Sequence, residues 1–598
     1  MSLLALIKRI PMQMPKIITI LVISVFILAG CNYPPRLTPM PSSFSTTSND
    51  WKATPSPFSD HTPISQLSPT MQPSEVLSQT LATETEQPDS QGETPESLNP
   101  TLDPKPKVFL HPGLSPNLIS QLNFGPDQIT NDENLAQYKI QMSNLETGGD
   151  HQINWIYVLV SPFYNIPDAL SFEELSALWQ QGLPTTSDFK QILIMPETLS
   201  AMAMIMGEPN PSAVKVLNSD DLMSRAVSDE KFLAILPWED LVPQWKILRL
   251  DDQSPIAADF DPSNYPLTLH IWCEGSSEDF TCDLPMRNYN PELRTVLIMT
   301  GVTAMTRATA YRMAVMGNAY PGKDIQSWLS SADITHISNE VPFAANCPDP
   351  DPVAPSLIFC SAPERIELLD SVGTDIIELS GNHMLDYGLD AIKLTLEMYE
   401  NRGWSYFAGG WNTADAQSAA LFTHNGNNLA FIGCNNVGPY SAFAGTSKPG
   451  ATPCGDLKWM VQEIQQLRSE SYLPIATFQY AEDYTAYPTS QMVRDFELLA
   501  DAGAIIVNGS QAHTPKLMTF YNGTFLHFGL GNLFFDQMDM LETRQEFIDR
   551  LIFYDGKLVS VELLTAMLEE YARPRPMVES ERETFLTRIF SAAINFLE

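Results

Sequence analysis

Apolar strand-like runs alternate with helical runs from about residue 291 to residue 572, and this alternation constrains the fold more than any other feature. Alternating strands and helices are typical of an α/β architecture, which is the fold class we predict. The expected strands are 296–300, 376–379, 429–433, 475–478, 505–507 and 525–528. The expected helices are 389–401, 458–468 and 491–501.

Most of these strands are followed at once by Gly, Asn, His or acidic residues. In open α/β sheets, ligands bind beside the carboxyl ends of the strands. We therefore expect the polar residues after different strands to form one ligand-binding site, where glycines let the backbone approach closely. The expected ligand-binding residues are Asn382, Gln479, Tyr480, Glu482, Tyr484, Gln511 and Asn532, next to His383 and His513.

The first thirty residues have the pattern of a targeting segment. They contain no acidic residue, and their apolar run 17–28 is shorter than the about 20 residues that span a bilayer. The run ends in Leu28-Ala29-Gly30-Cys31, which resembles the bacterial lipobox. That resemblance implies removal of residues 1–30 and a lipid on Cys31, hence an extracytoplasmic, lipid-anchored protein. The alternative is an uncleaved membrane anchor.

Residues 31–105 are rich in Pro, Ser and Thr and show no lasting period of 2 or 3.6. Such a segment cannot bury enough apolar surface to offset its ordering entropy. We predict a disordered tether that holds the folded part away from the membrane.

Six further cysteines follow Cys31, an even number in a chain that we expect to be exported, so disulfides are the default prediction. We expect neighbours in sequence to pair, because each pair flanks a loop-like stretch with Pro or Gly. The expected pairs are Cys273–Cys282, Cys347–Cys360 and Cys434–Cys454.

The formal net charge of −37 argues against a nucleic-acid partner, because neutralising phosphates requires clustered Lys and Arg. It also argues against adhesion to anionic lipid by charge alone. An acidic polymer would be repelled at long range, so contact with one needs a local cationic patch. Arg307, Arg312 and Lys516 are the candidates for that patch.

Residues 106–288 are expected to form a smaller α/β domain. The apolar runs 155–161 and 232–236 suit buried strands, and Ser171 with Glu174 forms a capping box that opens a helix. The order of strand, loop and helix resembles solute-binding proteins of the phosphate-binding type. The alternative is a generic α/β domain without a ligand.

Residues 289–598 carry a more specific pattern, which resembles the CapA family of capsule and poly-γ-glutamate synthesis proteins. The resemblance implies a calcineurin-like metallophosphatase fold, an αββα sandwich, here with a helical extension at the C-terminus. It rests on Glu340 in Ser338-Asn339-Glu340, Gly381-Asn382-His383 with Asp386-Tyr387-Gly388, Tyr484, Ala502-Gly503-Ala504 with Gly509 and His513, and Gly529-Leu530-Gly531-Asn532.

The departures from the family pattern concern metal ligands. Val302 replaces an Asp, Ser338 replaces an Asn, Gln479 stands where the family has a His, and Ser510-Gln511 stand where it has His-His. Neutral imidazoles and carboxylates are the usual ligands of such centres, so we do not expect a full two-metal site. At most one weakly bound divalent metal is expected, on Asn382, His383 and His513.

Three hypotheses remain for this site. The first is a non-catalytic cleft that recognises a cell-envelope polymer or glycan, with Tyr480, Tyr484 and Trp404 as apolar platforms. The second is a reworked hydrolase in which His383 or His513 is the general base. Its supporting carboxylates would be Asp386, Glu340, Glu482 or Asp483. The third is a buried polar network without a ligand.

Overall fold

The computed structural model describes residues 106–597, with gaps at 123, 146–151, 276–283 and 286. These residues belong to one compact unit, Pro100–Glu598. The predicted signal segment, the lipidation site Cys31 and the tether 31–105 lie outside the described residues. Among the helices that are described, none has the length and apolar character needed to cross a membrane.

The N-terminal part is built on a mixed sheet with the order β2-β1-β3-β11-β4-β8-β6-β7. Expected strands 155–161 and 232–236 are present as β4 and β8, and the Ser171 capping box opens α2, which ends at Gly182 in the left-handed region. The strands are β1 (Val108–Leu110), β2 (Ile129–Thr130), β3 (Tyr138–Ser143), β4 (Ile153–Pro162), β6 (Ile192–Ile194), β7 (Val214–Val216), β8 (Leu233–Pro237), β9 (Trp245–Ile247) and β11 (Thr268–Glu274). The helices are α1 (Pro116–Gln121), α2 (Phe172–Gln181), α3 (Pro196–Met206) and α4 (Ser219–Met223).

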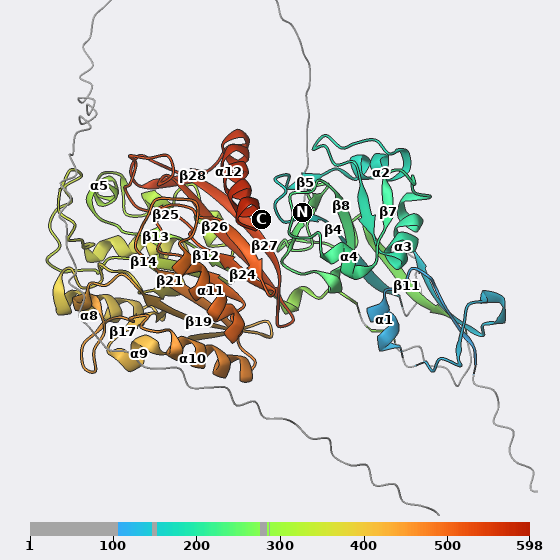
Figure 1. The fold of residues 1–598 in the computed structure, drawn as a ribbon, viewed down its shortest axis with the longest axis horizontal. Helices are drawn as coiled ribbons and strands as arrows, with labels where there is room; N and C mark the ends of the chain where they lie inside the picture. The colour runs from blue at the N-terminus through green and yellow to red at the C-terminus, as the bar shows by residue number, and fades with distance from the viewer. Residues whose placement is uncertain (1–105, 123, 146–151, 276–283, 286, 598) are drawn as a thin grey trace, which may run out of the picture. The chain divides into compact units, whose positions relative to one another are not determined.

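The C-terminal part contains two larger sheets, and its central strands run parallel (Figure 1). Sheet I consists of β16 (Ser405–Phe407), β15 (Ile376–Glu378), β14 (Ile334–Asn339), β12 (Arg294–Met299), β26 (Gln545–Tyr554), β27 (Lys557–Glu569) and β28 (Arg573–Pro576). The short strands β13 (Val302–Thr303) and β25 (Asn532–Phe534) extend it beside β14. Sheet II consists of β18 (Ala420–His424), β19 (Asn427–Asn435), β21 (Leu473–Gln479), β22 (Ile506–Asn508), β24 (Thr524–His527) and β23 (Met518–Tyr521).

The two sheets pack face to face between layers of helices. Alternate side chains of β12 show this: Leu297 and Met299 join the core shared with sheet II, whereas Ile298 joins the core under the helices on the other face. Those helices are α5 (Arg307–Met316), α6 (Gln326–Leu329), α7 (Glu367–Ser371) and α8 (Gly388–Glu400). Sheet II is covered by α10 (Lys458–Ser469) and α11 (Ser490–Ala502), and α12 (Glu579–Leu597) follows β28. The mixed α/β architecture and the αββα layering agree with the sequence prediction.

Two of the three expected disulfides are confirmed. Cys347 is bonded to Cys360 and Cys434 to Cys454, which closes loops with sequence separations of 13 and 20 residues. The third expected pair, Cys273–Cys282, includes Cys282, which lies outside the described residues.

Glu546 is a carboxyl group enclosed in β26, 1% exposed, and neither of its carboxyl oxygens has a hydrogen-bond partner. Burial raises its pKa well above the ordinary value. The folded state therefore holds the proton more tightly than the unfolded state. The resulting stabilisation is present below the unfolded pKa and is lost as the pH rises towards the folded pKa.

We expect Glu546→Gln to raise the melting temperature at pH 8 and to leave it nearly unchanged at pH 4. Thermal unfolding of the variant and the wild type across this range measures the difference. Glu397→Gln on the exposed side of α8 is the matched control. A variant that melts below the wild type at pH 8 would contradict a neutral, unpartnered Glu546.

Candidate functional site

Residues that follow different strands meet at one edge of the two sheets. Glu340 follows β14, His383 follows β15, Gln479 ends β21, and His513 follows β22. Asn532 begins β25, which β13 joins to β14. Because β14–β15 and β21–β22 are parallel pairs, their carboxyl ends lie at the same edge. The strand ends therefore bring these residues together at one edge.

The Glu340 carboxylate, 1% exposed, lies in the middle of this site. The Gln479 Nε2 lies 3.5 Å from its Oε1 and the His513 Nε2 lies 3.8 Å from the same oxygen. Gln479 Nε2 also donates to Asn382 Oδ1 at 2.8 Å. The other ring nitrogen of His513, Nδ1, lies 2.8 Å from Asn532 Oδ1. Amides and imidazoles thus surround one buried carboxylate.

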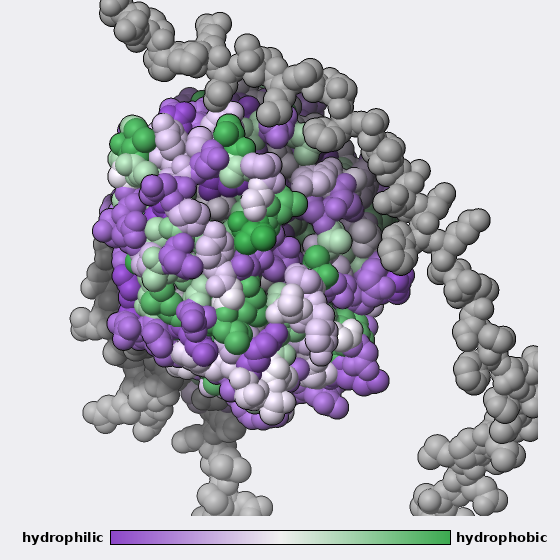
Figure 2. Space-filling view, turned by 90° about the vertical axis from the view of Figure 1, so that its left-hand side faces the viewer, coloured by the Kyte–Doolittle hydropathy of each residue, from purple (hydrophilic) through white to green (hydrophobic). Residues whose placement is uncertain are grey.

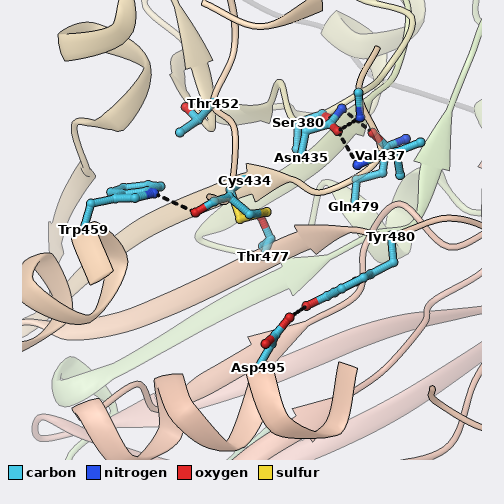
Figure 3. Close-up of a disulfide and its surroundings, with 12 residues drawn as sticks. Ser380, Cys434, Asn435, Val437, Thr452, Trp459, Thr477, Gln479, Tyr480 and Asp495 are labelled. Atoms are coloured by element: carbon cyan, nitrogen blue, oxygen red, sulfur yellow. Dashed lines mark hydrogen bonds between the residues drawn. A yellow bond between two sulfur atoms is a disulfide. The ribbon is translucent and has the colours of Figure 1, made fainter. Parts of the chain in front are cut away.

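Asn435, at the end of β19, fixes the orientation of the Gln479 amide. Its Nδ2 donates to Gln479 Oε1 at 2.7 Å and to the Ser380 carbonyl at 2.8 Å (Figure 3). With its oxygen occupied, the Gln479 amide directs its NH₂ group to Glu340 and Asn382. The Cys434–Cys454 disulfide lies directly beside Asn435 in the chain.

His383 and Asp386 form a close pair in the turn between β15 and α8. His383 Nδ1 lies 2.7 Å from Asp386 Oδ2, which also accepts the Phe359 backbone N–H at 2.8 Å. Burial acts to lower the pKa of His383, but the hydrogen bond to Asp386 and the negative charge of Glu340 outweigh it, so the pKa is raised. His383 is therefore a partly exposed imidazole that readily carries a positive charge.

An aromatic wall borders the two histidines. The Phe359 ring centroid lies 4.5 Å from that of His383, and the Phe535 centroid lies 5.4 Å from that of His513. The Arg307 guanidinium stacks over both Phe rings, at 4.8 and 5.2 Å. Arg307 has a φ of +44°, an uncommon conformation for a residue with a side chain, and it is bound to Asp536.

The loop after β21 contacts the loop after β22. Glu482 accepts the backbone N–H of His513 and so fixes the backbone of the loop after β22. Asp483 forms a salt bridge with Lys516, which is 2% exposed. Tyr484 has a φ of +53° and is 45% exposed.

Next to this site, which we call the cleft, a second polar cluster is centred on Glu378, which ends β15 and is completely buried. Its carboxylate accepts hydrogen bonds from the hydroxyl groups of Ser338 (3.0 Å), Ser380 (2.5 Å), Thr477 (2.8 Å) and Ser510, and the His336 Nε2 lies 3.3 Å away. Burial acts to raise the pKa of Glu378, but the neighbouring His336 and these hydroxyls outweigh it and lower the pKa. Glu378 is therefore an ionised group in the core.

Several predicted site residues do not face the cleft. Tyr480 packs on Phe478 and its hydroxyl donates to Asp495 of α11 at 2.6 Å (Figure 3), and Trp404 packs on Tyr399, so neither is an apolar platform in the cleft. Gln511 is 2% exposed and donates to Ser338 at 2.6 Å.

The three candidate cations already have partners. Arg307 binds Asp536, Lys516 binds Asp483, and Arg312 donates to the Glu570 carbonyl. No free cationic patch is formed by these three residues.

Glu378 was not among the predicted site residues, although the sequence around it indicates a buried polar cluster. An acidic residue inside the apolar run Ile376–Leu379 is unusual in a buried strand and requires partners. Those partners include Ser338 and Ser510, two of the residues at which the chain departs from the family pattern.

The donor set does not fit a metal centre. Among the residues that the structure describes, no three His, Cys, Asp or Glu side chains are placed to hold one ion. At the substituted positions, Val302 has no donor atom, while Ser338 and Ser510 are bound to Glu378. The Gln479 amide turns its NH₂ group, not its oxygen, to the cleft.

Residues 296–537 match the family model described as bacterial capsule synthesis protein PGA_cap. The match covers less than half of the 598 residues, and this part of the chain is similar to that family. The match covers β12 to β25 and therefore includes every strand end that contributes to the cleft.

Two curated relatives are similar over parts of the chain. The PGA biosynthesis protein CapA of Bacillus subtilis is 25% identical over 175 residues, 29% of this chain and 46% of that protein. The capsule biosynthesis protein CapA of Bacillus anthracis is 24% identical over 245 residues, 40% of this chain and 60% of that protein. The chain thus spans about half the length of these relatives.

Among solved structures, a putative 5'-nucleotidase from Staphylococcus aureus matches with a TM-score of 0.31 and 11% identity, over 50% of this chain and 58% of the other.

Proposed function

We propose that this chain acts outside the cytoplasm, anchored by a lipid on Cys31, in the synthesis, attachment or recognition of a cell-envelope polymer such as a capsule or poly-γ-glutamate. Similarity of residues 296–537 to the capsule synthesis family supports the process. The lipobox-like sequence and two disulfides support the compartment, because disulfides persist in oxidising environments.

Within this role the cleft recognises the polymer without a metal ion. One observation carries this proposal. Ser338 and Ser510 stand at substituted positions of the family pattern, and their hydroxyl groups donate hydrogen bonds to the buried Glu378 instead of facing an ion. The side chains left at the cleft are Asn382, His383 and His513, all partly exposed. They offer hydrogen bonds to a polar ligand rather than a ligand set for an ion.

The outer surface suits a hydrated ligand. Figure 2 shows one face of the molecule as mostly hydrophilic, with small separate hydrophobic areas and no continuous apolar surface. Because the chain is strongly acidic, added salt screens its repulsion of an acidic polymer. We expect the affinity for such a polymer to rise with salt, and we expect no binding of nucleic acid.

The test is binding of purified poly-γ-glutamate, and of neutral capsule glycans, to the full chain in detergent. We expect Asn382→Ala and His513→Gln each to weaken binding about tenfold, about 1.4 kcal/mol. Asn401→Ala, on the exposed end of α8, is the control and should bind like the wild type. Unchanged affinity in both cleft variants would overturn the proposal.

A second candidate function is hydrolysis, which the His383–Asp386 pair favours. A carboxylate that orients an imidazole is the arrangement of a general base, and the 2.7 Å contact is within its range. Depolymerisation that the wild type performs and His383→Ala lacks would establish this function in place of recognition alone.

A further inference from the structure

A pocket of about 280 Å³ lies beside the cleft, under the loop that the Cys347–Cys360 disulfide closes. Phe359 and Arg307 line it and also form the aromatic wall of the cleft. The pocket is smaller than the about 300–1,000 Å³ of sites for drug-sized ligands. Its size suits one terminal group rather than a run of polymer.

Arg365 is a buried charged residue that lines this pocket. It lies in the 3-10 turn Pro363–Ile366 and is only 5% exposed. Within the described chain, its guanidinium has neither a hydrogen bond nor a salt bridge. A guanidinium has five N–H donors, and the 5% exposed Arg365 has little contact with water to satisfy them. The geometry therefore lacks an acceptor that a bound carboxylate would supply.

The mouth of the pocket carries the opposite charge. Asp349 and Asp351 line it, both are exposed, and neither forms a salt bridge with any described residue. Arg307 does not change this balance, because Asp536 neutralises it. The negative charges of Asp349 and of the neighbouring Glu364 act on Arg365 without contacting it. A cation inside and two carboxylates at the mouth would repel a simple anion but suit a group with both charges.

We infer that this pocket binds an α-amino-acid head group, with its carboxylate on Arg365 and its ammonium at Asp349 and Asp351. The choice of polymer rests on the proposed function. In a γ-linked glutamyl chain, the amino-terminal residue carries its ammonium and its carboxylate on the same carbon. The pocket would hold that end, and the chain would continue past Phe359 into the cleft. A strongly acidic protein would thus hold an acidic polymer by its zwitterionic end.

Calorimetry on the full chain with three synthetic pentamers tests this inference. We expect γ-linked glutamate with a free amino end to bind. The same oligomer with an acetylated end lacks the ammonium, and α-linked glutamate has no free α-carboxylate at its amino end. Both should bind at least tenfold more weakly. Equal binding of the three oligomers would overturn the inference.

Substitutions in the pocket test whether the oligomer binds there. Arg365→Gln should weaken binding of the free-amino γ-oligomer at least tenfold, whereas Arg494→Gln, on the exposed side of α11, should not change it. Because Arg365 is buried, Asp349→Asn and Asp351→Asn at the exposed mouth provide a second arm. Both substitutions should weaken binding of the free-amino oligomer and leave binding of the acetylated oligomer unchanged. Reduction of the Cys347–Cys360 disulfide should also weaken binding.

The outcomes separate this inference from the proposed function. If polymer binds and depends on Asn382 and His513 but not on Arg365 or the two aspartates, the head-group pocket is wrong and the proposed function stands. If Asp349→Asn destabilises the fold without affecting binding, Asp349 is the internal partner of Arg365 and the pocket is not a site. If neither polymer nor oligomer binds, the proposed function fails.

Discussion

Glu378→Gln is expected to lower the free energy of unfolding by about 3–5 kcal/mol, the usual cost of breaking a buried ionic cluster by removing one member. The carboxylate is completely buried and accepts four hydroxyl groups, with His336 beside it. Gln keeps the volume but removes the charge and turns an NH₂ group towards donors. Urea unfolding at pH 7 measures the loss.

The pH dependence of this effect has a defined sign. The pKa of Glu378 is lowered in the folded state, so its stabilisation is present above the unfolded pKa and is lost as the pH falls through the folded pKa. The difference between wild type and variant should therefore shrink in acid. Glu397→Gln on the surface of α8 should change stability by less than about 0.5 kcal/mol. Equal stability of the two variants at pH 7 would show that the Glu378 cluster does not hold the core together.

The second large effect is expected from the Cys434–Cys454 disulfide. Replacing both cysteines with Ala should cost about 3 kcal/mol, because the bond closes a loop with a separation of 20 residues and restricts the unfolded chain. Cys434 also precedes Asn435, which holds Gln479 at the cleft. We therefore expect weaker polymer binding as well.

Thermal and urea unfolding of the double variant measure the stability loss. The wild type under reducing conditions serves as the comparison, and Cys347–Cys360 variants separate the contribution of the other loop. A double variant within about 1 kcal/mol of the wild type would contradict a structural role for this bond.

The gathering of the site residues could be predicted because it follows from topology alone. Polar residues after parallel strands must meet at one edge of a sheet, and Asn382, His383, Gln479 and His513 do so. The six expected strands of the C-terminal part are also present. They could be predicted because a continuous apolar run indicates a buried strand. The antiparallel strands β26 and β27 were not predicted, although β26 joins β12 in the middle of sheet I.

The direction of individual side chains could not be predicted. Tyr480 is next to Gln479 in sequence, yet successive residues point to opposite sides, and its hydroxyl reaches Asp495. Ser510 donates to the buried Glu378 carboxylate and Gln511 donates to Ser338, and the positions of these partners depend on the packing of both sheets. The burial of Arg365 gave no sign in the sequence, because a single Arg in a polar stretch is ordinary on a surface.

The most direct test of the account is binding and turnover of the polymer by the full chain, with a chelator and with added Mn²⁺ or Zn²⁺. Recognition without a metal ion predicts the same affinity in both conditions and no shortening of the polymer. Polymer cleavage that requires the metal and disappears in His383→Ala would contradict it.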